Sequence, residues 1–320
     1  MFNRKVNYIE FISLIMIGAI LAGGYGKRLK PITDHIPKAL VEIRDNYTIM
    51  DRQLFDFKNI GIKDVYILSG YLSEKIEERY KNYRDLNIHY LKEEKPMGTL
   101  FSLKNLMDNI NDDVIVRNGD TITDINFKNF VETAKTKDYG MLMYVTKMKS
   151  PFGIVEFSGD KIYNFKEKPE LDYYINAGLY YIKKSMFNVF SRKYIEKDIE
   201  KSVFPYIVKN NEMGVYNEDA LWIGIDSEKD LGIIRKEYEY RDDTSFGYIK
   251  HLYNLNNKKI DEYYIRSGEE MVINETGIIK INYGAGYIDD NKYDGYKIFT
   301  VDKLFKVFVY ENTDMDIMRV

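Results

Sequence analysis

A short stretch near the start of the chain brings glycines and positive charges together. It follows an apolar run that ends at Leu21, and its glycines and cations are Gly23, Gly24, Gly26, Arg28 and Lys38. Glycines let backbone N–H groups approach a phosphate closely, and some adopt positive φ so that several amides point the same way. The guanidinium fork and the ammonium group add positive charge to the same loop. This combination predicts a loop that binds a polyphosphate.

Two common phosphate-binding loops do not fit this stretch. A P-loop requires a glycine separated by four residues from Gly-Lys-Ser/Thr, but Leu21 stands at the first position and Arg28 at the last. A dinucleotide-binding loop requires a third glycine at the position of Leu29. From the glycines alone, an ordinary tight turn remains the alternative interpretation.

A candidate acidic group follows another apolar strand. The run from Val114 to Asp120 ends in Arg-Asn-Gly-Asp. Because ligands of open α/β sheets bind beyond the carboxyl ends of the strands, we expect Asp120 beside the phosphate loop. A carboxylate repels a polyphosphate unless a hard cation lies between them, so Asp120 indicates a Mg²⁺ ligand. Alone, Asn-Gly-Asp is more often a turn, and we assign the nearby Asp124 to a turn or a helix cap.

The stretch 21–40 resembles, nearly residue for residue, the signature of the sugar-1-phosphate nucleotidylyltransferases. That signature reads Leu-Ala-Gly-Gly-x-Gly-x-Arg-Leu-x-Pro-x-Thr, then Pro-Lys-x-Leu, and further family elements follow in order across residues 16–240. The resemblance implies an enzyme that uses Mg²⁺ to join a nucleoside triphosphate to a sugar 1-phosphate, releasing pyrophosphate. It implies nucleotide binding by Leu21, Gly23, Gly24 and Gly26, and catalysis by Arg28, Lys38 and Asp120.

The resemblance also implies a second metal-binding carboxylate near the end of this region. Many members carry an aspartate two residues after an aromatic residue, but here Gly224 takes that place after Trp222. Some cytidylyltransferase-like relatives have the aspartate four residues after the aromatic, which matches Asp226, and we assign the second metal ligand there. The alternative is that Asp226 only precedes and caps the last helix of the region.

Three further elements resemble the part of the family site that holds the sugar phosphate. They are a short strand with Gly153, a Glu-Lys-Pro run with Glu167 and Lys168, and an Asn-Ala-Gly element that begins at Asn176. In the family, the lysine holds the acceptor phosphate and the glutamate accepts hydrogen bonds from sugar hydroxyls. By itself Lys-Glu-Lys is a solvated charged turn, so the assignment depends on the order of the elements.

The loop with Glu93 and Gly98 resembles the base-reading loop of the family. Many UTP- and dTTP-dependent relatives have glutamine at the first position, whereas an ionised Glu93 only accepts hydrogen bonds. Guanine presents two adjacent donors, so we expect GTP as the nucleotide, with mannose or heptose 1-phosphate as the acceptor. Cytosine also presents an amine, and Glu94 is an alternative reader.

Two other functions remain open. One is a UTP-, dTTP- or CTP-dependent enzyme that acts on glucose 1-phosphate or another phosphorylated acceptor. The other is a catalytically silent subunit that senses nucleotide sugars, which only Gly224 favours. Such subunits usually lose the loop arginine or lysine or the strand-end aspartate, and this chain retains Arg28, Lys38 and Asp120.

Composition excludes several other classes of protein. The 320 residues carry a net charge of −3, which provides no basic face for nucleic acid, and the lack of cysteine rules out disulfides and thiolate chemistry. The apolar run 11–21 is too short to span a bilayer, so we expect no membrane partner and a cytoplasmic location. We interpret residues 1–15 as a tail and expect a homo-oligomer.

Alternating apolar strands and helical segments through about residue 240 predict an α/β fold with a Rossmann-like, doubly wound mixed sheet. We place this catalytic domain at 16–242, with an amphipathic helix over 49–60 and Ser73 as the cap of the next helix. Short alternating strands predict a small all-β domain at 243–320. It looks faintly like a cupin barrel without the histidine pair of a metal site.

Overall fold

The computed structural model of the chain describes residues 16–95, 97–192, 197–255 and 258–319, and the predicted tail 1–15 lies outside them. The described chain divides into two compact units. The first comprises the chain up to Glu42 together with Asn46–Asp230, and the second comprises Ile43–Asp45 and the chain from Leu231 onward.

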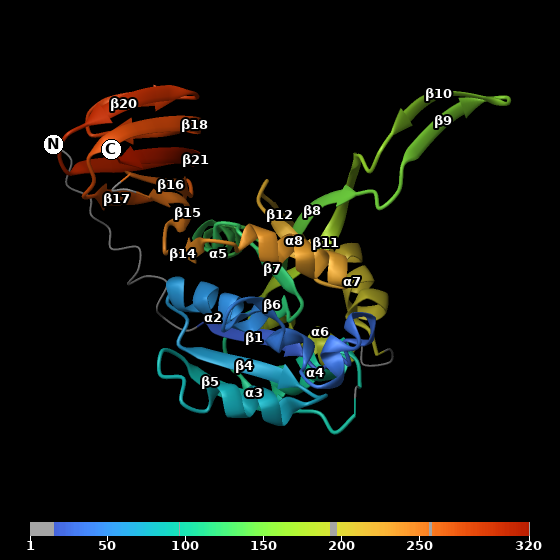
Figure 1. Cartoon of the computed structure of the whole chain (residues 1–320). Helices are drawn as coiled ribbons and strands as arrows, with labels where there is room; N and C mark the ends of the chain where they lie inside the picture. Colours follow the sequence, from blue (N-terminus) through green and yellow to red (C-terminus); the bar gives the residue numbers. More distant parts are fainter. Residues whose placement is uncertain (1–15, 96, 193–196, 256–257, 320) are drawn as a thin grey trace. The chain divides into compact units, whose positions relative to one another are not determined.

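A seven-stranded mixed sheet forms the centre of the first unit (Figure 1). Its strands lie in the order β12-β8-β11-β6-β1-β4-β5. They are β1 (Ile17–Ala22), β4 (Asp64–Ser69), β5 (Asn87–Lys92), β6 (Val114–Asn118), β8 (Met141–Lys149), β11 (Glu170–Ile182) and β12 (Met213–Asn217). Neighbouring strands are parallel except at β11, which runs antiparallel to both β6 and β8.

The order of the strands reverses beside β1. The chain runs outward from β1 through β4 to β5, and then returns to the other side of β1 as β6. In doubly wound sheets, such a reversal leaves a crevice beyond the carboxyl ends of the two strands, where ligands bind. The fold therefore places the residues that follow β1 and β6 around this crevice.

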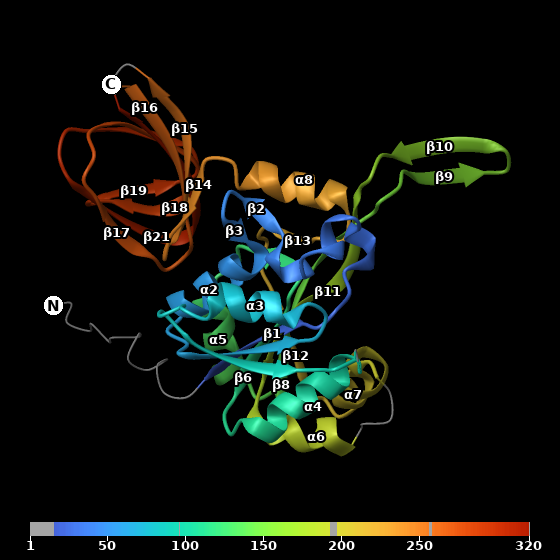
Figure 2. The ribbon, with the colours of Figure 1, turned by 60° about the horizontal axis from the view of Figure 1, so that its bottom comes forward.

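Helices cover both faces of this sheet and bury two apolar clusters (Figure 2). One face packs against α2, α3 and α5, and the other packs against α4, α6 and α7. Within β1, Ala19 and Ile20 join opposite clusters, because successive side chains of a strand point to opposite faces. These helices are α2 (Ile49–Asn59), α3 (Ser73–Tyr80), α4 (Thr99–Asn109), α5 (Phe127–Thr136), α6 (Phe187–Arg192) and α7 (Ile199–Lys209), whereas α8 (Glu228–Glu237) begins in the first unit and continues in the second.

Local sequence determines where two of these helices begin. At α2, Thr48 accepts a hydrogen bond from the Asp51 N–H, and the Asp51 carboxylate accepts one from the Thr48 N–H, which forms a capping box. The helix predicted over 49–60 is thus confirmed, ending one residue earlier. At α3 the predicted cap is wrong: Leu72, with φ 54°, is the N-cap, and Ser73 is the first helical residue.

Shorter elements connect these layers. β7 (Thr121–Thr123) pairs with β13 (Trp222–Gly224), and β9 (Ile154–Ser158) pairs with β10 (Lys161–Lys166) as a separate hairpin. This hairpin projects away from the seven-stranded sheet (Figures 1 and 2). The remaining short elements are η1 (Lys27–Leu29), η2 (Ile32–Asp34), η3 (Lys38–Leu40), β2 (Glu42–Arg44), β3 (Tyr47–Thr48) and η4 (Lys184–Met186).

The second unit is built on an eight-stranded antiparallel sheet with its own apolar core. The two longest strands, β18 and β21, pair along most of their length and contribute buried residues such as Ile281 and Ile317. The strands are β14 (Arg241–Asp243), β15 (Gly247–Leu255), β16 (Lys258–Ile265), β17 (Glu270–Ile273), β18 (Gly277–Ile288), β19 (Asn291–Asp294), β20 (Lys297–Val301) and β21 (Phe305–Arg319).

The predicted fold class is confirmed: a Rossmann-like mixed sheet with helices on both faces, followed by an all-β C-terminal region. Among the helices of the described ranges, none has both the length and the apolar character needed to cross a bilayer.

Candidate active site

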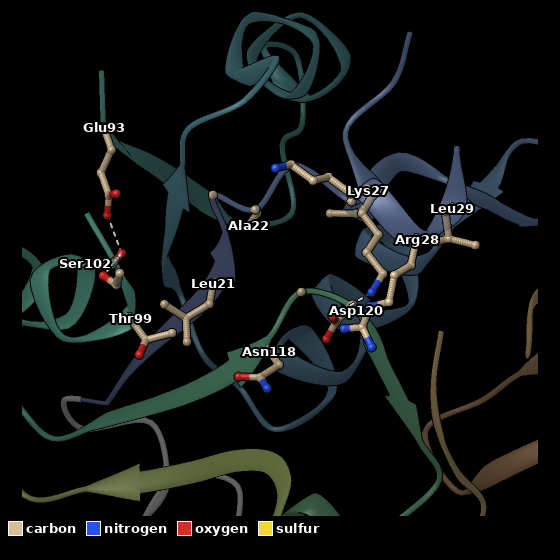
Figure 3. Close-up of a pocket in the computed structure, with 17 residues that line it drawn as sticks. Leu21, Ala22, Lys27, Arg28, Leu29, Glu93, Thr99, Ser102, Asn118 and Asp120 are labelled. Carbon is tan, nitrogen blue, oxygen red and sulfur yellow. Dashed lines mark hydrogen bonds and ion pairs between the residues drawn. The ribbon is translucent and has the colours of Figure 1, made fainter. Parts of the chain in front are cut away.

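A cavity of about 380 Å³ lies where the strand order reverses. The segments after β1, β5 and β6 line it, together with the first turn of α4 (Figure 3). Nine of the residues predicted from the sequence are among its lining residues: Leu21, Gly23, Gly24, Gly26, Arg28, Lys38, Glu93, Gly98 and Asp120. The structure therefore brings the predicted phosphate loop, base-reading loop and strand-end aspartate to one place.

The glycine loop is open to the cavity at Gly24 and tightly packed at Gly26. A Cβ added at Gly24 would meet no atom within 4 Å, so the backbone there is accessible to a ligand from the cavity side. Gly26 has φ 61°, and a Cβ at this position would lie 2.9 Å from Thr33 Cγ2. Thr33 Oγ1 also donates to Gly26 O at 2.8 Å. These contacts of Gly26 with Thr33 fix the loop just before Arg28.

One ammonium group joins the loop to two carboxylates. Lys38 Nζ lies 2.7 Å from Asp120 Oδ2 and 2.7 Å from Asp226 Oδ1, and its side chain is only 14% exposed. Arg28 Nη1 lies 3.0 Å from the other oxygen of Asp226. Two cations and two carboxylates thus meet beside the glycine loop, and all four residues were predicted as site residues.

Asp226 does not act as the helix cap that was its alternative role. Ser227 takes that position, because the Asp230 N–H donates to Ser227 Oγ at 3.3 Å while Ser227 Oγ donates to the Asp230 carboxylate. The Asp226 carboxylate points to Lys38 instead. Gly224 lies opposite Thr121 in the β13–β7 pair, two residues before Asp226.

The donor set around Lys38 fits a small hard cation. Mg²⁺ commonly uses one or two carboxylates and completes its shell with water and substrate phosphates, and Asp120 and Asp226 supply two carboxylates to one point. Among the described residues, no group of three or more acidic, histidine or cysteine side chains forms a complete protein cage for a metal. The geometry therefore fits a cation that is shared with a bound phosphate.

Gln53 is a site residue that the sequence analysis did not assign. It lies on α2 with its side chain fully buried, and its Nε2 donates to Asn118 O and to Thr121 O, each at 2.8 Å. These carbonyls flank Gly119 and Asp120, so one amide fixes both ends of the turn that carries the carboxylate. One feature of the sequence could have indicated this role: Gln53 is the only glutamine of the chain, and it lies on an apolar face of its helix.

Buried charged side chains also stabilise the region of this turn. Arg52, Asp56 and Arg117 are each at most 3% exposed, and Arg117 Nη1 lies 2.6 Å from Asp56 Oδ2. Arg52 pairs with Asp56 and lies 3.2 Å from Asp124 Oδ1. Asp124 was expected in a turn or cap, but it is a buried member of this network, and Asn126 caps α5 instead. Buried charges persist in proteins when they are paired in this way.

Glu93 lies at the opposite end of the cavity from Asp120 and Arg28 (Figure 3). Its carboxylate accepts hydrogen bonds from Ser102 Oγ and from the Met97 N–H, the latter at 3.0 Å. The residue is 9% exposed. Each carboxylate oxygen has two lone pairs, so Glu93 retains acceptor capacity while it shapes its own loop.

The four residues predicted to hold the sugar phosphate are not among those that line the cavity. Glu167 and Lys168 follow β10, with the Lys168 Nζ 3.4 Å from Glu167 Oε1, and both side chains are at least half exposed. Gly153 precedes β9, where an added Cβ would lie 2.6 Å from the Phe165 ring. Asn176 lies on β11 and donates to the Tyr180 hydroxyl at 2.7 Å, and burial raises the pKa of this phenol.

Comparison with known proteins gives a family and close relatives. The family described as Nucleotidyl transferase matches residues 17–233. The mannose-1-phosphate guanyltransferase of Debaryomyces hansenii is 31% identical over 229 residues, 68% of this chain and 62% of that protein. The mannose-1-phosphate guanylyltransferase catalytic subunit beta of Drosophila pseudoobscura is 32% identical over 223 residues, 66% of this chain and 59% of that protein. The match thus spans about three fifths of these relatives.

Solved structures share the fold at lower identity. A UDP-glucose pyrophosphorylase complexed with UDP-glucose matches with a TM-score of 0.55 and 17% identity, over 70% of this chain and 98% of that one. HddC from Yersinia pseudotuberculosis matches with a TM-score of 0.54 and 21% identity, over 71% of this chain and all of that one. At these identities the likeness shows the fold alone.

Proposed function

The chain belongs to the nucleotidyl transferase family, and from this membership we propose that it transfers a guanylyl group from GTP to mannose 1-phosphate or heptose 1-phosphate. The observation that carries the proposal is the meeting of Arg28, Lys38, Asp120 and Asp226 beside an accessible glycine loop. Such a site can neutralise the charge of a triphosphate and of a second phosphate that approaches it.

The reaction is an in-line displacement at phosphorus. A phosphate oxygen of the acceptor attacks the α-phosphorus of the nucleotide, the bond to the β-phosphate breaks, and pyrophosphate leaves with that bridging oxygen. Nucleotidyl and phosphoryl transfers require little covalent chemistry from the protein, so catalysis rests on positioning and on stabilisation of charge. We assign binding of the leaving pyrophosphate to Arg28 and neutralisation near the α-phosphate to Lys38.

Asp120 and Asp226 are the residues that would hold Mg²⁺. When bound, this ion would withdraw negative charge from the phosphoryl group under attack. Gln53 then acts as a positioning residue, because its two hydrogen bonds fix the turn on which Asp120 stands. Lys168, at the base of the hairpin, would counter the charge of the acceptor phosphate, with Glu167, Gly153 and Asn176 around the sugar.

The preference for guanine rests on Glu93. An ionised carboxylate accepts hydrogen bonds and donates none, which suits the ring N–H and exocyclic amine of guanine. Several curated relatives are named mannose-1-phosphate guanyltransferases, in agreement with this choice of nucleotide. Leu21, the glycine loop and Gly98 would form the remaining contacts to the nucleotide.

The test measures pyrophosphate release in the presence of Mg²⁺. Each of the five common nucleoside triphosphates is combined with the 1-phosphates of mannose, glucose, galactose, N-acetylglucosamine and heptose. We expect the highest kcat/KM for GTP with mannose or heptose 1-phosphate. A higher kcat/KM with UTP, dTTP or CTP would overturn the assignment of Glu93. If no combination releases pyrophosphate while nucleotide sugars still bind, the protein is a sensing subunit and not an enzyme.

A further inference from the structure

The β9–β10 hairpin of the first unit has one apolar face. Successive side chains of a strand point to opposite sides, and the cross-strand register groups four apolar residues on the same side. This apolar hairpin face consists of Val155, Phe157, Ile162 and Phe165. On the other side Asn164 donates to Glu156 at 3.0 Å, so that side is polar. Such a division between faces is typical of strands that pack against something on one side.

Within the described parts of the chain, nothing covers this face. Phe157 is 69%, Ile162 60% and Phe165 61% exposed, and the adjacent Phe152 and Tyr163 are 74% and 65% exposed. The described residues also provide no third strand to the hairpin. A two-stranded hairpin is marginal by itself in water, and a contiguous exposed apolar patch marks an interaction surface.

We propose that the apolar hairpin face packs against the same face of a second copy of this chain, which forms a two-fold dimer. The four face residues present roughly 400 Å² of apolar side-chain area, because a large aromatic side chain exposes about 150–250 Å² in full, and the adjacent Phe152 and Tyr163 bring the exposed apolar area of the hairpin to roughly 700 Å². A standard interface buries about 800 Å² per partner. The apolar hairpin face thus supplies about half of the area that a stable dimer needs, and the two adjacent aromatic residues can add to it.

The charges around the face are compatible with self-association. Glu156 and Asp160 are opposed in sign by Lys161 and Lys166, and all four residues are exposed. In a two-fold dimer the same surface meets itself, so a net charge on it would repel its copy. The register places Glu156, Lys161 and Lys166 on the polar side of the hairpin, so the apolar hairpin face would bring no like charges together in such a dimer.

The apolar hairpin face ends where the proposed sugar-phosphate contacts begin. A Cβ at Gly153 would lie 2.6 Å from the Phe165 ring and 3.0 Å from Glu167 Oε2, and Lys168 follows directly. A dimer contact that holds Phe165 therefore also restricts Gly153 and Glu167. This coupling to the site rests on the proposed function, whereas the dimer itself does not.

The first test compares molar masses. The hairpin variant carries Phe157→Glu, which places like charges opposite each other in the dimer but alters only one side chain of the monomer, 69% exposed. Ile162 is left unchanged, because it lies directly opposite Phe157 in the hairpin and a second glutamate there would repel the first within one chain. The matched control carries Tyr296→Glu in the second unit, at a residue that is 65% exposed. Light scattering after size exclusion, at several micromolar concentrations, gives the mass, and circular dichroism checks the fold.

We expect the wild type and the control at twice the 37.9 kDa of one chain, and the hairpin variant at 37.9 kDa. A monomeric wild type, a hairpin variant that keeps the double mass, or a control that dissociates would each overturn the proposed dimer contact.

The second test measures the coupling. We expect the hairpin variant to raise KM for the sugar phosphate about tenfold and to leave KM for the nucleotide unchanged, because only the acceptor side loses its alignment. An unchanged KM for the sugar phosphate in a monomeric variant would overturn the coupling. Absence of pyrophosphate release from every form of the protein would contradict the proposed function, while the mass result would still decide the dimer.

Discussion

Lys38 Nζ lies 2.7 Å from Asp226 Oδ1, although 188 positions separate the two residues in the chain. The same nitrogen lies 2.7 Å from Asp120 Oδ2. One ammonium group therefore neutralises part of the charge of two carboxylates that would otherwise repel each other. A phosphate that enters the cavity would compete with both carboxylates for Lys38, which would free their oxygens for a cation. The contact thus links the glycine loop to the proposed metal ligands.

Asp226→Asn should lower kcat by about 100-fold or more, because a neutral amide replaces one of the two carboxylates at the proposed cation site. The matched control is Glu228→Gln, which removes an exposed carboxylate from the first turn of α8. This control should lower the free energy of unfolding by less than about 1 kcal/mol and leave kcat near the wild-type value. Steady-state rates of pyrophosphate release distinguish the two variants. A wild-type rate for Asp226→Asn would show that the role of Asp226 is only structural.

Arg28→Ala should reduce the rate of pyrophosphate release by about 10²–10³-fold, the usual effect of removing one preorganised charge from a phosphoryl site. The side chain is 75% exposed, so the urea midpoint of unfolding should not change. Lys30→Ala removes a neighbouring exposed cation that pairs with Asp34, and it should leave the rate unaltered. Loss of the folded state in the Arg28 variant, or an unchanged rate, would refute the assignment.

Gln53→Met removes both donors that hold the Asp120 turn but keeps a side chain of similar shape. Two carbonyls then each lose one donor, although Asn118 O keeps the Thr121 hydroxyl, and this should lower the free energy of unfolding by about 1–3 kcal/mol. We also expect a higher Mg²⁺ concentration for half-maximal rate, because the carboxylate is less well placed. Phe57→Leu on the same helix should destabilise the unit by about 1 kcal/mol without this change. An equal Mg²⁺ requirement in both variants would limit Gln53 to a structural role.

The sequence predicted the elements whose cause is local. The glycine loop and the helix over 49–60 depend on the spacing of apolar residues and on capping groups, and both occur where expected. Asp120 lies at the loop because the carboxyl ends of parallel strands meet at one edge of the sheet. The prediction that Ser73 caps α3 was wrong because Leu72 adopts φ 54° and takes the cap position. A positive φ is uncommon for a residue other than glycine, so the sequence pattern did not indicate it.

Contacts between residues that are far apart in the chain could not be predicted from the sequence. The bond from Gln53 to the Asp120 turn requires α2 to lie directly beneath β6 and β7, and no periodicity encodes that register. The ion pair between Arg52 and Asp124 is hidden for the same reason. The sugar-phosphate residues were found by resemblance, but none of them lines the cavity. Gly153, Glu167 and Lys168 flank the β9–β10 hairpin, whose direction its own sequence does not determine, whereas Asn176 lies on β11.

Glu93→Gln should lower kcat/KM for GTP by about 10- to 100-fold, because the amide would present a donor to a base edge that offers donors. The loop should remain intact, since the amide oxygen can still accept from the Met97 N–H and the amide nitrogen can donate to Ser102 Oγ. The control is Glu94→Gln, and competition between GTP and UTP gives the ratio directly. If the Glu94 variant loses the preference for guanine instead, Glu94 and not Glu93 is the residue that recognises the base.

The second unit should lose stability in acid through Asp261, whose side chain is 1% exposed. Burial would raise the pKa of Asp261, but hydrogen bonds from Lys259 and His251 and the charge of Arg319 outweigh it, so the pKa lies below its usual value. A lowered pKa stabilises the fold above the unfolded-state value, about 3.9, and this stabilisation disappears as the pH falls through the folded-state value. Asp261→Asn should therefore lower the free energy of unfolding by about 3 kcal/mol near neutral pH, and by progressively less below about pH 4. Urea unfolding of both proteins across this range tests the prediction, which a pH-independent difference would contradict.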